Sequence, residues 1–369
     1  MTKSNAKLFR MIVGAATALF IAAAFLNRQG SRPVRTEAPQ TLVAGLEARA
    51  GDITRIEITT PDGSLELVRT ESRWTLPSKD GYPVDLEAVR TLVAGLASLE
   101  IIDQKTANPD NHGRLGLAVP TDPGSDTEPA MAQAPTRVRL LAADGSAVAD
   151  VIVGNRAPTG VFVRTADDDQ TWLADSAPET SIDPADWFDQ RPVQVERDQV
   201  RTVTLTHPDG EVVRIVKNED TFELAELPEG TEPVGPWQAG QPGGALAFLT
   251  VEDVRATDAI GFDDTEQVVV QYELVGEDAD AAEQPTLTVR VAEIEGTPWA
   301  TFAAAGPGAD DVNAITEGWA YAIPAFTRDS LTRRIADLTQ PIEPEPIDDA
   351  AGGLAGPEVP AALTPPSDD

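Results

Sequence analysis

Apolar and polar positions follow the same pattern in two distant stretches of the chain. In "ITRIEITTPDGSLELVRTESRWTL", residues 53–76, Ile56 and Ile58 alternate with polar residues, which is the period of a half-buried strand. "VRTVTLTHPDGEVVRIVKNEDTFEL", residues 200–224, repeats the alternation from Val203. A Pro-Asp-Gly turn follows in both, because Pro fixes φ, Asp bonds back to the backbone and Gly accepts positive φ. Each stretch therefore predicts a β-hairpin and a third strand.

The sequence does not decide which side chains of the second strand in each hairpin point inward. Leu65 and Leu67 in the first stretch do not align in register with Val213 and Ile215 in the second. The pattern therefore does not say which residues of these two strands face the core. The third strands contain Trp74 and Phe222.

One helix is expected after each set of three strands. In the first copy, Asp85 is placed as an N-cap, and residues 87–101 carry apolar residues at helical spacing, which predicts a helix lying on a sheet. These residues are Val89, Leu92, Val93, Leu96 and Leu99. The second copy has a weaker match over residues 245–255, with Leu246, Leu249 and Val251. The Pro- and Gly-rich segment before it, "PEGTEPVGPWQAGQPGG", is expected to be an exposed linker.

Further short strands and a closing helical segment complete both copies. The first continues with "TRVRLLA", "ADVIVG", "VFVRT" and "QTWLAD" and closes with "DPADWFDQRPV". The second continues with "QVVVQYELV", "TLTVRVAEI", "PWATFAA" and "GWAYAI" and closes with "AFTRDSLTRRIADL". Strand runs interrupted by single helices predict an α+β fold of two tandem duplicated modules, each a mainly antiparallel sheet with a covering helix. We expect one common strand order in residues 50–192 and 198–340.

The N-terminal region has the pattern of a membrane segment. Residues 11–26, "MIVGAATALFIAAAFL", carry no charge and would span about 24 Å as a helix. Two interpretations stay open, a transmembrane signal-anchor and a signal peptide cleaved near Ala22-Ala23-Ala24. The anchor is favoured because the apolar run exceeds the roughly 7–15 residues of the apolar region in a typical signal peptide. A short basic tail, residues 1–10, precedes the run, and a linker, residues 27–49, follows it.

Basic residues do not orient this segment. Three lie on each side, so the positive-inside rule gives a tie. They are Lys3, Lys7, Arg10, Arg28, Arg32 and Arg35. A short tail before a large exported domain is the common bacterial arrangement, which predicts a single-pass protein of the cytoplasmic (inner) membrane with most of its chain facing the periplasm. Residues 341–369 contain no Lys, Arg or aromatic residue, so this acidic, Pro-rich tail is expected to be disordered.

Composition narrows the function classes. Lys and Arg total 28 against 61 Asp and Glu, a net charge of −33, which repels nucleic acid. A solvated acidic surface that favours solubility is the first interpretation, and a basic partner or a salty outside medium would also suit this charge. The chain has no cysteine, which excludes disulfides, thiolate zinc sites and cysteine nucleophiles and fits an oxidising compartment. Its two histidines, His112 and His207, lie in loop-like contexts without an Asp-x-His or serine-elbow motif. Both are expected to be solvated or to cap a turn.

Two loops could hold a ligand. Residues 154–160, "GNRAPTG", could cradle phosphate only if a helix followed, but "VFVRT" follows, which favours a hairpin turn. The run Asp167-Asp168-Asp169 could bind calcium, yet it lacks the spaced acidic residues and central Gly of an EF-hand and sits where a polar hairpin tip is expected. No catalytic, cofactor-binding or metal-binding residue is assigned.

The six tryptophans could form a carbohydrate platform, but most fit the core better. Four lie in strand-like runs where packing is expected, namely Trp74, Trp172, Trp299 and Trp319. Trp187 lies in the first closing helical segment. Trp237 lies in the Pro- and Gly-rich segment, which makes it the one aromatic expected to be exposed.

The ordered motifs of the first copy resemble a known family. "RWTLPSKDGYPVDLEAVRTLVAGLASLEI", "HGRLGLAVP", "VIVGNRAPTGVFVR", "TWLAD" and "DWFDQRPV" are similar in order to the bacterial domain-of-unknown-function 4340 family. The second copy resembles it loosely. The resemblance implies a membrane anchor and, for some members, association with ABC-type exporters of the gliding-motility kind. The chain departs from the usual Tyr-Gly-Leu-like motif at Leu115-Gly116-Leu117. The family brings no established catalytic residues.

Two functions follow as hypotheses. The first is a membrane-anchored, non-enzymatic accessory or scaffold protein of a bacterial cell-envelope complex, with an ABC-type exporter as a candidate. The alternative is an envelope hydrolase or ligand-binding protein with an unrecognised site. A deep pocket with converging carboxylates would favour the alternative.

Overall fold

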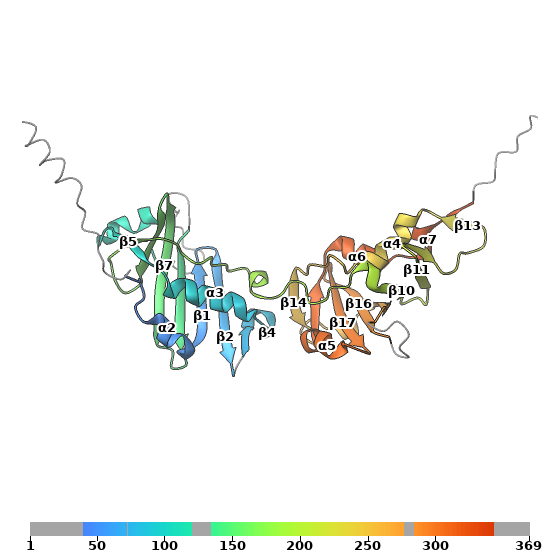
Figure 1. Cartoon of the computed structure of the whole chain (residues 1–369), viewed down its shortest axis with the longest axis horizontal. Coiled ribbons are helices and arrows are strands. Elements are labelled where there is room, and N and C mark those ends of the chain that lie inside the picture. Colours follow the sequence, from blue (N-terminus) through green and yellow to red (C-terminus); the bar gives the residue numbers. More distant parts are fainter. Residues whose placement is uncertain (1–39, 72, 120–133, 277–283, 343–369) are drawn as a thin grey trace, which may run out of the picture. The chain divides into compact units, whose positions relative to one another are not determined.

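The computed structural model describes residues 40–71, 73–119, 134–276 and 284–342 (Figure 1). The chain divides into two compact units, with the boundary between Phe188 and Asp189. The predicted transmembrane segment, residues 11–26, and nearly all of the C-terminal tail lie outside the described residues. Within the described ranges, no helix is long and apolar enough to cross a membrane.

Unit 1 contains one sheet of nine strands, in which all paired neighbours are antiparallel. The order across the sheet is β4-β3-β2-β1-β6-β7-β8-β9-β5. The strands are β1 (Ile53–Thr60), β2 (Gly63–Thr70), β3 (Arg73–Leu76), β4 (Tyr82–Pro83), β5 (Ile101–Gln104), β6 (Thr136–Ala142), β7 (Ala147–Ala157), β8 (Gly160–Thr165) and β9 (Trp172–Ala174).

Unit 2 contains a sheet of eight antiparallel strands in the order β12-β11-β10-β15-β16-β17-β18-β14. They are β10 (Val200–Thr206), β11 (Val212–Asn218), β12 (Thr221–Leu224), β14 (Asp253–Ala256), β15 (Val268–Leu274), β16 (Thr286–Ile294), β17 (Thr297–Ala305) and β18 (Trp319–Ala322). A separate ribbon pairs β13 (Thr231–Pro233) with β19 (Thr339–Pro341). Without the edge strand β4, the sheet of unit 1 runs β3-β2-β1-β6-β7-β8-β9-β5, which is the same order as in unit 2 when β1 is matched with β10, β2 with β11, and so on along the chain. The two units therefore have the common strand order that was expected.

The pairing of the two hairpins shows which residues of the returning strands face the core. Ile58 pairs with Leu65 in unit 1, and Leu205 pairs with Val213 in unit 2. All four side chains are buried, so they occupy equivalent inward positions. The connection in unit 2 is one residue longer, which explains why the two returning strands do not align in the sequence.

The first predicted helix is present as α3 (Leu86–Ala97). Asp85 caps it as expected, because its side chain accepts a hydrogen bond from the backbone N–H of Glu87 at 2.9 Å. The helix ends earlier than predicted. Ile101 donates its backbone N–H to the carbonyl of Gln40, and Leu42 donates to the carbonyl of Leu99, so this segment pairs with residues 40–42. Residues 40–49, expected to be linker, are therefore held against unit 1, where they form α2 (Leu46–Arg49).

The helix predicted over residues 245–255 is wrong. The helix of unit 2 is α4 (Pro236–Gly244), inside the segment expected to be an exposed linker, and β14 begins at Asp253. A Cβ at Gly243 would lie 2.5 Å from the ring of Phe222 on β12, so the absence of a side chain lets α4 press against the sheet. Contact with the sheet overrides the poor helix propensity of this Pro- and Gly-containing segment.

Short helices complete both units. The first closing segment forms a 3-10 turn, Pro184–Trp187, whose start is capped by Asp183. The second forms α6 (Ala325–Leu331) and α7 (Ile335–Leu338), and α5 (Ala309–Thr316) packs against β17. Other 3-10 turns are Ala50–Asp52, Pro77–Lys79, Pro109–Asn111, Gly113–Leu115, Arg197–Gln199 and Phe262–Asp264. The described parts of the chain therefore form a mainly antiparallel β fold with some helices and two large sheets.

Candidate functional site

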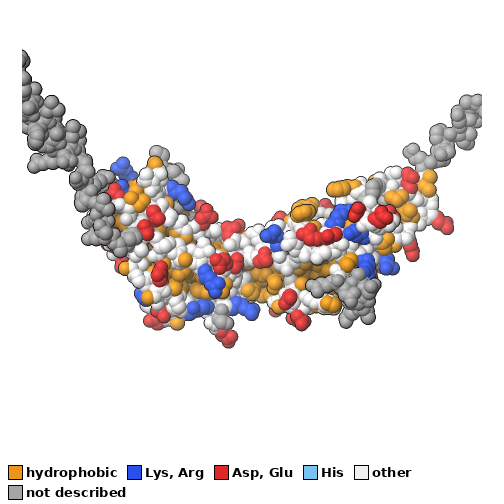
Figure 2. Space-filling model, viewed as in Figure 1, with side chains coloured by type: hydrophobic (Ala, Val, Ile, Leu, Met, Phe, Trp, Pro, Cys, Tyr) orange, Lys and Arg blue, Asp and Glu red, His pale blue; other side chains and the backbone are white. Residues whose placement is uncertain are grey.

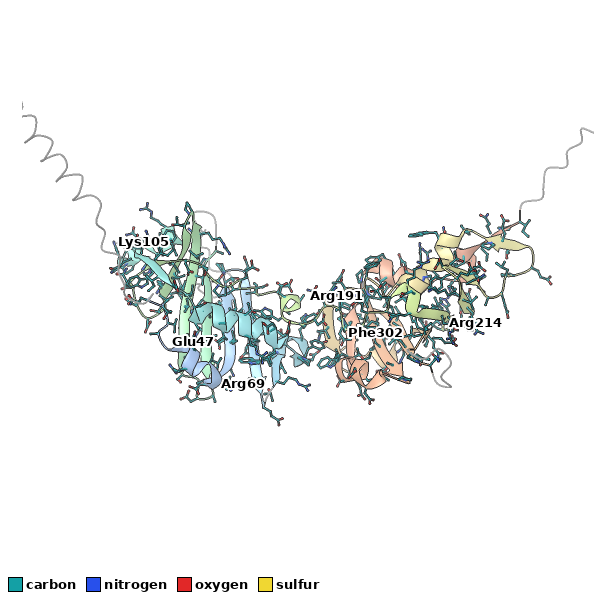
Figure 3. The ribbon with its side chains drawn as sticks, viewed as in Figure 1. Glu47, Arg69, Lys105, Arg191, Arg214 and Phe302 are labelled. Atoms are coloured by element: carbon teal, nitrogen blue, oxygen red, sulfur yellow. The ribbon has the colours of Figure 1, made fainter. Side chains whose placement is uncertain are left out.

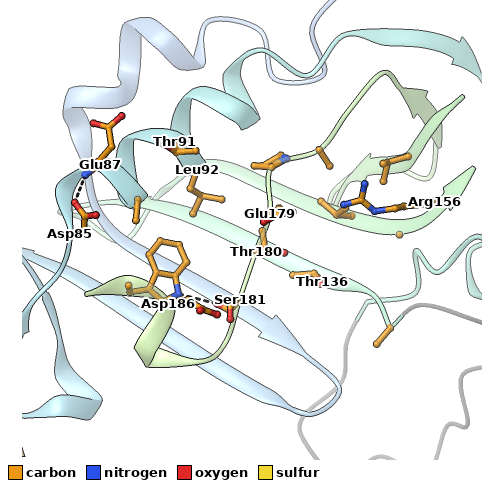
Figure 4. A pocket seen from close by; sticks show the side chains of 18 residues that line it. Asp85, Glu87, Thr91, Leu92, Thr136, Arg156, Glu179, Thr180, Ser181 and Asp186 are labelled. Carbon is orange, nitrogen blue, oxygen red and sulfur yellow. Dashed lines mark hydrogen bonds between the residues drawn. The ribbon is translucent and has the colours of Figure 1, made fainter. Parts of the chain in front are cut away.

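Unit 1 contains a cleft of about 920 Å³ between α3, strands β6 to β8 and residues 177–187, which we call the strap (Figure 4). Leu92 projects from α3 toward the strap, and Arg156 comes from β7 at the far end of the view. Apolar side chains of the lining are Ala88, Leu92, Ala134, Val153, Val161, Ala177, Pro178 and Trp187. Hydroxyl side chains of the lining are Thr91, Thr136, Thr180 and Ser181.

The strap is fastened to α3. Asp85, at the start of the helix, donates its backbone N–H to the carbonyl of Trp187 at 2.7 Å. The indole N–H of Trp187 donates to the carbonyl of Ser181 at 3.1 Å (Figure 4). Further along the helix, a Cβ at Gly95 would lie 2.7 Å from the Cβ of Pro178, so the strap approaches a helix surface without a side chain. These contacts fix the wall of the cleft.

Carboxylates outnumber cations around the cleft. Asp85, Glu87, Glu179 and Asp186 line it, against Arg156. The carboxylate of Asp85 caps the helix. The Oε2 atom of Glu87 lies 3.8 Å from Nη1 of the exposed Arg90. Glu179, Asp186 and Arg156 make no ion pair with any other residue that the structure describes. The cleft can therefore hold a cationic group by charge and a polar backbone by its hydroxyls.

On the face of the sheet away from the cleft, a buried arginine holds a loop and a turn in place. The Arg164 guanidinium on β8 donates from Nε to the carbonyl of Leu117 at 2.9 Å and from Nη1 to the carbonyls of Thr165, Ala166 and Asp168. Burial lowers the pKa of Arg164. Leu117 belongs to the Leu-Gly-Leu motif at which the chain departs from the resembled family, so this motif is an anchoring point of the sheet.

Both histidines are buried, which corrects the expectation that they are solvated. His112 is 6% exposed, and its Nε2 lies 2.9 Å from the carbonyl oxygen of Asp169. His207 is 4% exposed, and its Nε2 lies 3.1 Å from the carbonyl oxygen of Arg333. A carbonyl only accepts, so Nε2 carries the proton in both. Each histidine joins two segments of its own unit that are distant in sequence.

The two candidate ligand loops are turns, as predicted. Residues 154–160 belong to the hairpin of β7 and β8, in which Ala157 pairs with Gly160. Asp167, Asp168 and Asp169 are exposed between β8 and β9, and the Asp168 carboxylate accepts the backbone N–H of Gln170 at 2.9 Å. In the described ranges, no group of three or more His, Asp or Glu side chains is placed to hold a metal ion.

Three aromatic side chains of unit 2 project into solvent. Phe248, Trp237 and Phe326 are 85%, 72% and 66% exposed, the highest values among large apolar side chains of the described residues. Trp237 lies on α4, Phe248 follows α4, and Phe326 lies on α6, which contacts α4. Figure 2 shows hydrophobic side chains on the upper surface of unit 2 over α6 and α4. We call Trp237, Phe248 and Phe326 the aromatic trio.

Sequence patterns identified only part of these surfaces. Trp237 was expected to be exposed, and the tryptophans in β3, β9, β17 and β18 do lie in strands. Phe248 and Phe326 carried no signal, because each lies in a segment that also carries buried leucines. The cleft carried no signal either, since its lining comes from separate segments that meet only in the fold.

Comparison with known proteins gives a match to a family. The sequence profile of a family described as "Domain of unknown function (DUF4340)" matches residues 74–274, from β3 of unit 1 to the end of β15 of unit 2. No curated protein and no solved structure matches the chain. The match covers more than half of the 369 residues and includes the whole lining of the cleft. The chain therefore belongs to the DUF4340 family.

Proposed function

We propose that the chain is a non-enzymatic accessory or scaffold subunit of a bacterial cell-envelope complex. In this proposal residues 11–26 anchor it in the inner membrane and both units face the periplasm. An ABC-type exporter is the candidate complex, because the family resemblance implies such an association for some members. The observation that carries the proposal is the aromatic trio of unit 2.

Exposed aromatic side chains of this kind favour a protein partner. Burial of a large apolar side chain is worth about 1.5–3 kcal/mol, which unit 2 forgoes at Trp237, Phe248 and Phe326. Aromatic residues, Phe included, are enriched in protein interfaces, and Trp is among the residues that contribute most of the binding energy. The trio lies on α4, the turn after it and α6, so one partner surface can cover elements that already contact each other.

The histidine contacts favour this function over hydrolysis. General-base catalysis needs an imidazole nitrogen that can reach a substrate. Nε2 of His112 and Nε2 of His207 are each engaged with a main-chain carbonyl inside the fold. The unprotonated Nδ1 remains as a base on each ring, but both rings are almost fully buried, so a substrate could reach it only by displacing the packing around the ring. The cleft of unit 1 supports the ligand-binding form of the alternative.

The proposal is tested by crosslinking the membrane-embedded chain and recovering its partners. We compare the wild type with the triple variant Trp237→Ser, Phe248→Ser, Phe326→Ser. The matched control is Ile102→Ser with Val212→Ser, since both side chains are about half exposed and lie on β5 and β11. The trio variant is expected to lose an envelope protein that the wild type and the control retain. Equal recovery from all three chains overturns the proposal.

A second arm distinguishes the enzymatic alternative. Ala substitutions at His112, His207 and residues 167–169 are introduced one site at a time, and folding, partner recovery and function in cells are scored. Loss of function with intact folding and partner recovery would favour a catalytic or metal-dependent role. Loss of function together with folding is the result expected for the two buried histidines.

A further inference from the structure

We propose that the cleft of unit 1 binds an extended segment of a partner protein that carries Lys or Arg side chains. This site is separate from the aromatic trio, which lies in unit 2, and the inference stands without the proposed function. It begins from the unequal charges of the cleft and from its mixed polar and apolar lining.

Charge complementarity selects a cationic occupant. Four carboxylates line the cleft against the single guanidinium of Arg156. Those of Glu179 and Asp186 have no ion-pair partner among the residues that the structure describes, so they keep their charge available for a ligand. The net charge of −33 for the whole chain adds a long-range attraction for a basic partner and repels an acidic one.

The lining fits a polypeptide better than a small cation. The hydroxyls of Thr91, Thr136 and Thr180 make no hydrogen bond within the described part of the chain, and each can donate to a carbonyl or accept from an N–H. The half-buried Val153 and Pro178 offer apolar surface beside them. An extended chain presents peptide groups and alternating side chains every 3.3 Å or so, which matches a groove with both kinds of surface.

The cleft is pre-organised for such a segment. The strap is tied to the start of α3 through Asp85 and Trp187, and it packs against Gly95 through Pro178. A wall held in this way loses little conformational freedom when a ligand enters, which reduces the cost of binding. A flexible basic segment would bear most of the ordering cost itself.

The test measures binding of a dye-labelled octapeptide of alternating Lys and Val to the full chain by fluorescence anisotropy, with Glu replacing Lys in the control peptide. The cleft variant combines Glu87→Gln, Glu179→Gln and Asp186→Asn and leaves the cap residue Asp85 intact. The control variant combines Glu47→Gln, Asp52→Asn and Asp110→Asn, which changes the net charge equally at exposed sites of unit 1 outside the cleft; Glu47 is marked in Figure 3.

The Lys peptide is expected to bind the wild type and to bind the cleft variant at least about tenfold more weakly. The control variant should change the affinity less than about twofold, and the Glu peptide should not bind. Thr91→Trp, which fills the cleft from an exposed helix position without changing charge, should weaken binding as well. The inference is overturned if the wild type binds neither peptide or both equally, or if cleft and control variants lose affinity to the same extent. Partner recovery through the aromatic trio is unaffected by these results.

Discussion

The guanidinium of Arg164 on β8 donates from Nε to the carbonyl oxygen of Leu117 at 2.9 Å, although the two residues are 47 positions apart. The same guanidinium bonds three carbonyls of the turn that follows β8. One buried cation thus joins a loop and a hairpin tip through main-chain groups alone. The contacts depend on Arg geometry and not on the identity of the side chains at the accepting positions.

Arg164→Met is expected to lower the free energy of unfolding by about 3 kcal/mol, because the buried carbonyl of Leu117 and the part-buried carbonyls of the turn lose their donor while the volume of the side chain is largely kept. Urea unfolding followed by tryptophan fluorescence measures the change. Arg156→Met is the control, since Arg156 is exposed on the neighbouring strand and should change stability by less than about 0.5 kcal/mol. Similar losses in both variants would contradict the role assigned to Arg164.

Gly95→Ala should destabilise unit 1 even though Ala favours helices by about 1 kcal/mol over Gly. The added Cβ would lie 2.7 Å from the Cβ of Pro178, so the strap must shift, at a cost of about 1–3 kcal/mol. Thermal unfolding checks the sign of the change. Gly51→Ala meets nothing within 4 Å and should be neutral. A Gly95→Ala protein more stable than the wild type would show that the strap is not held against α3.

Tyr272→Phe should cost about 1–2 kcal/mol in unit 2, because the buried Tyr272 hydroxyl donates to the carbonyl of Pro242 in α4 at 2.7 Å. Burial also raises the pKa of Tyr272, so the hydroxyl stays protonated and remains a donor. Hydrogen exchange of the α4 amides should accelerate in the variant while those of β16 change little. Unchanged exchange in α4 would refute the role of this bond.

Asp209→Asn should make stability less dependent on pH in the acidic range. The backbone N–H of Glu211, and then the guanidinium of Arg334, hold the pKa of Asp209 below its ordinary value. A lowered folded pKa adds stability that is present above the unfolded-state pKa and is lost as the pH falls through the folded pKa. The urea midpoint of Asp209→Asn should therefore lie below that of the wild type at pH 7, and the gap should close near pH 2.

Asp62→Asn is the matched control for this comparison. Asp62 occupies the corresponding Pro-Asp-Gly turn of unit 1, and it makes no ion pair with the described residues. Its substitution should shift the midpoint less than Asp209→Asn at pH 7. A gap for Asp209→Asn that is equally large at pH 7 and at pH 2 would contradict the assignment.

A phosphatase reporter that is active only outside the cytoplasm, fused after Pro341, tests the predicted orientation. Activity is expected if the two units are exported. The same fusion without residues 11–26 should be inactive, because the apolar run supplies the export signal. An inactive full-length fusion at normal expression would reverse the predicted orientation.

Sequence patterns predicted the elements whose local signals agree with their packing. Asp85 caps α3, and the helix buries Leu92 and Leu96, as its periodicity requires. The sequence of α4 predicts a loop and not a helix, since Pro242 and three glycines have low helix propensity. Its helix depends on Phe222 and Arg197, which lie far from it in sequence. No local pattern records such contacts.

The candidate surfaces were less predictable than the fold. Hydrophobic periodicity places Leu92 on the buried face of α3, but it cannot show that the strap crosses that face and leaves a cleft beside it. The histidines were expected to be solvated or to cap a turn because they lie in loop-like contexts. Both are buried, and each ring meets a carbonyl that is distant in sequence. Tertiary contacts decide how exposed the cleft residues and the histidines are and which groups they bond.

The dependence of α4 on distant partners has a consequence for the order of events during translation. A nine-residue helix is too short to be stable alone in water. Two of the bonds that hold it come from Tyr272, which is 30 residues beyond Pro242, and from Arg333, which is 92 residues beyond Gln241. A ribosome releases β10 to β12 well before either partner exists. The nascent second unit therefore passes through a stage in which the apolar surface around Phe222 lacks its cover, and any chaperone that binds the growing chain meets that stage and not the finished fold.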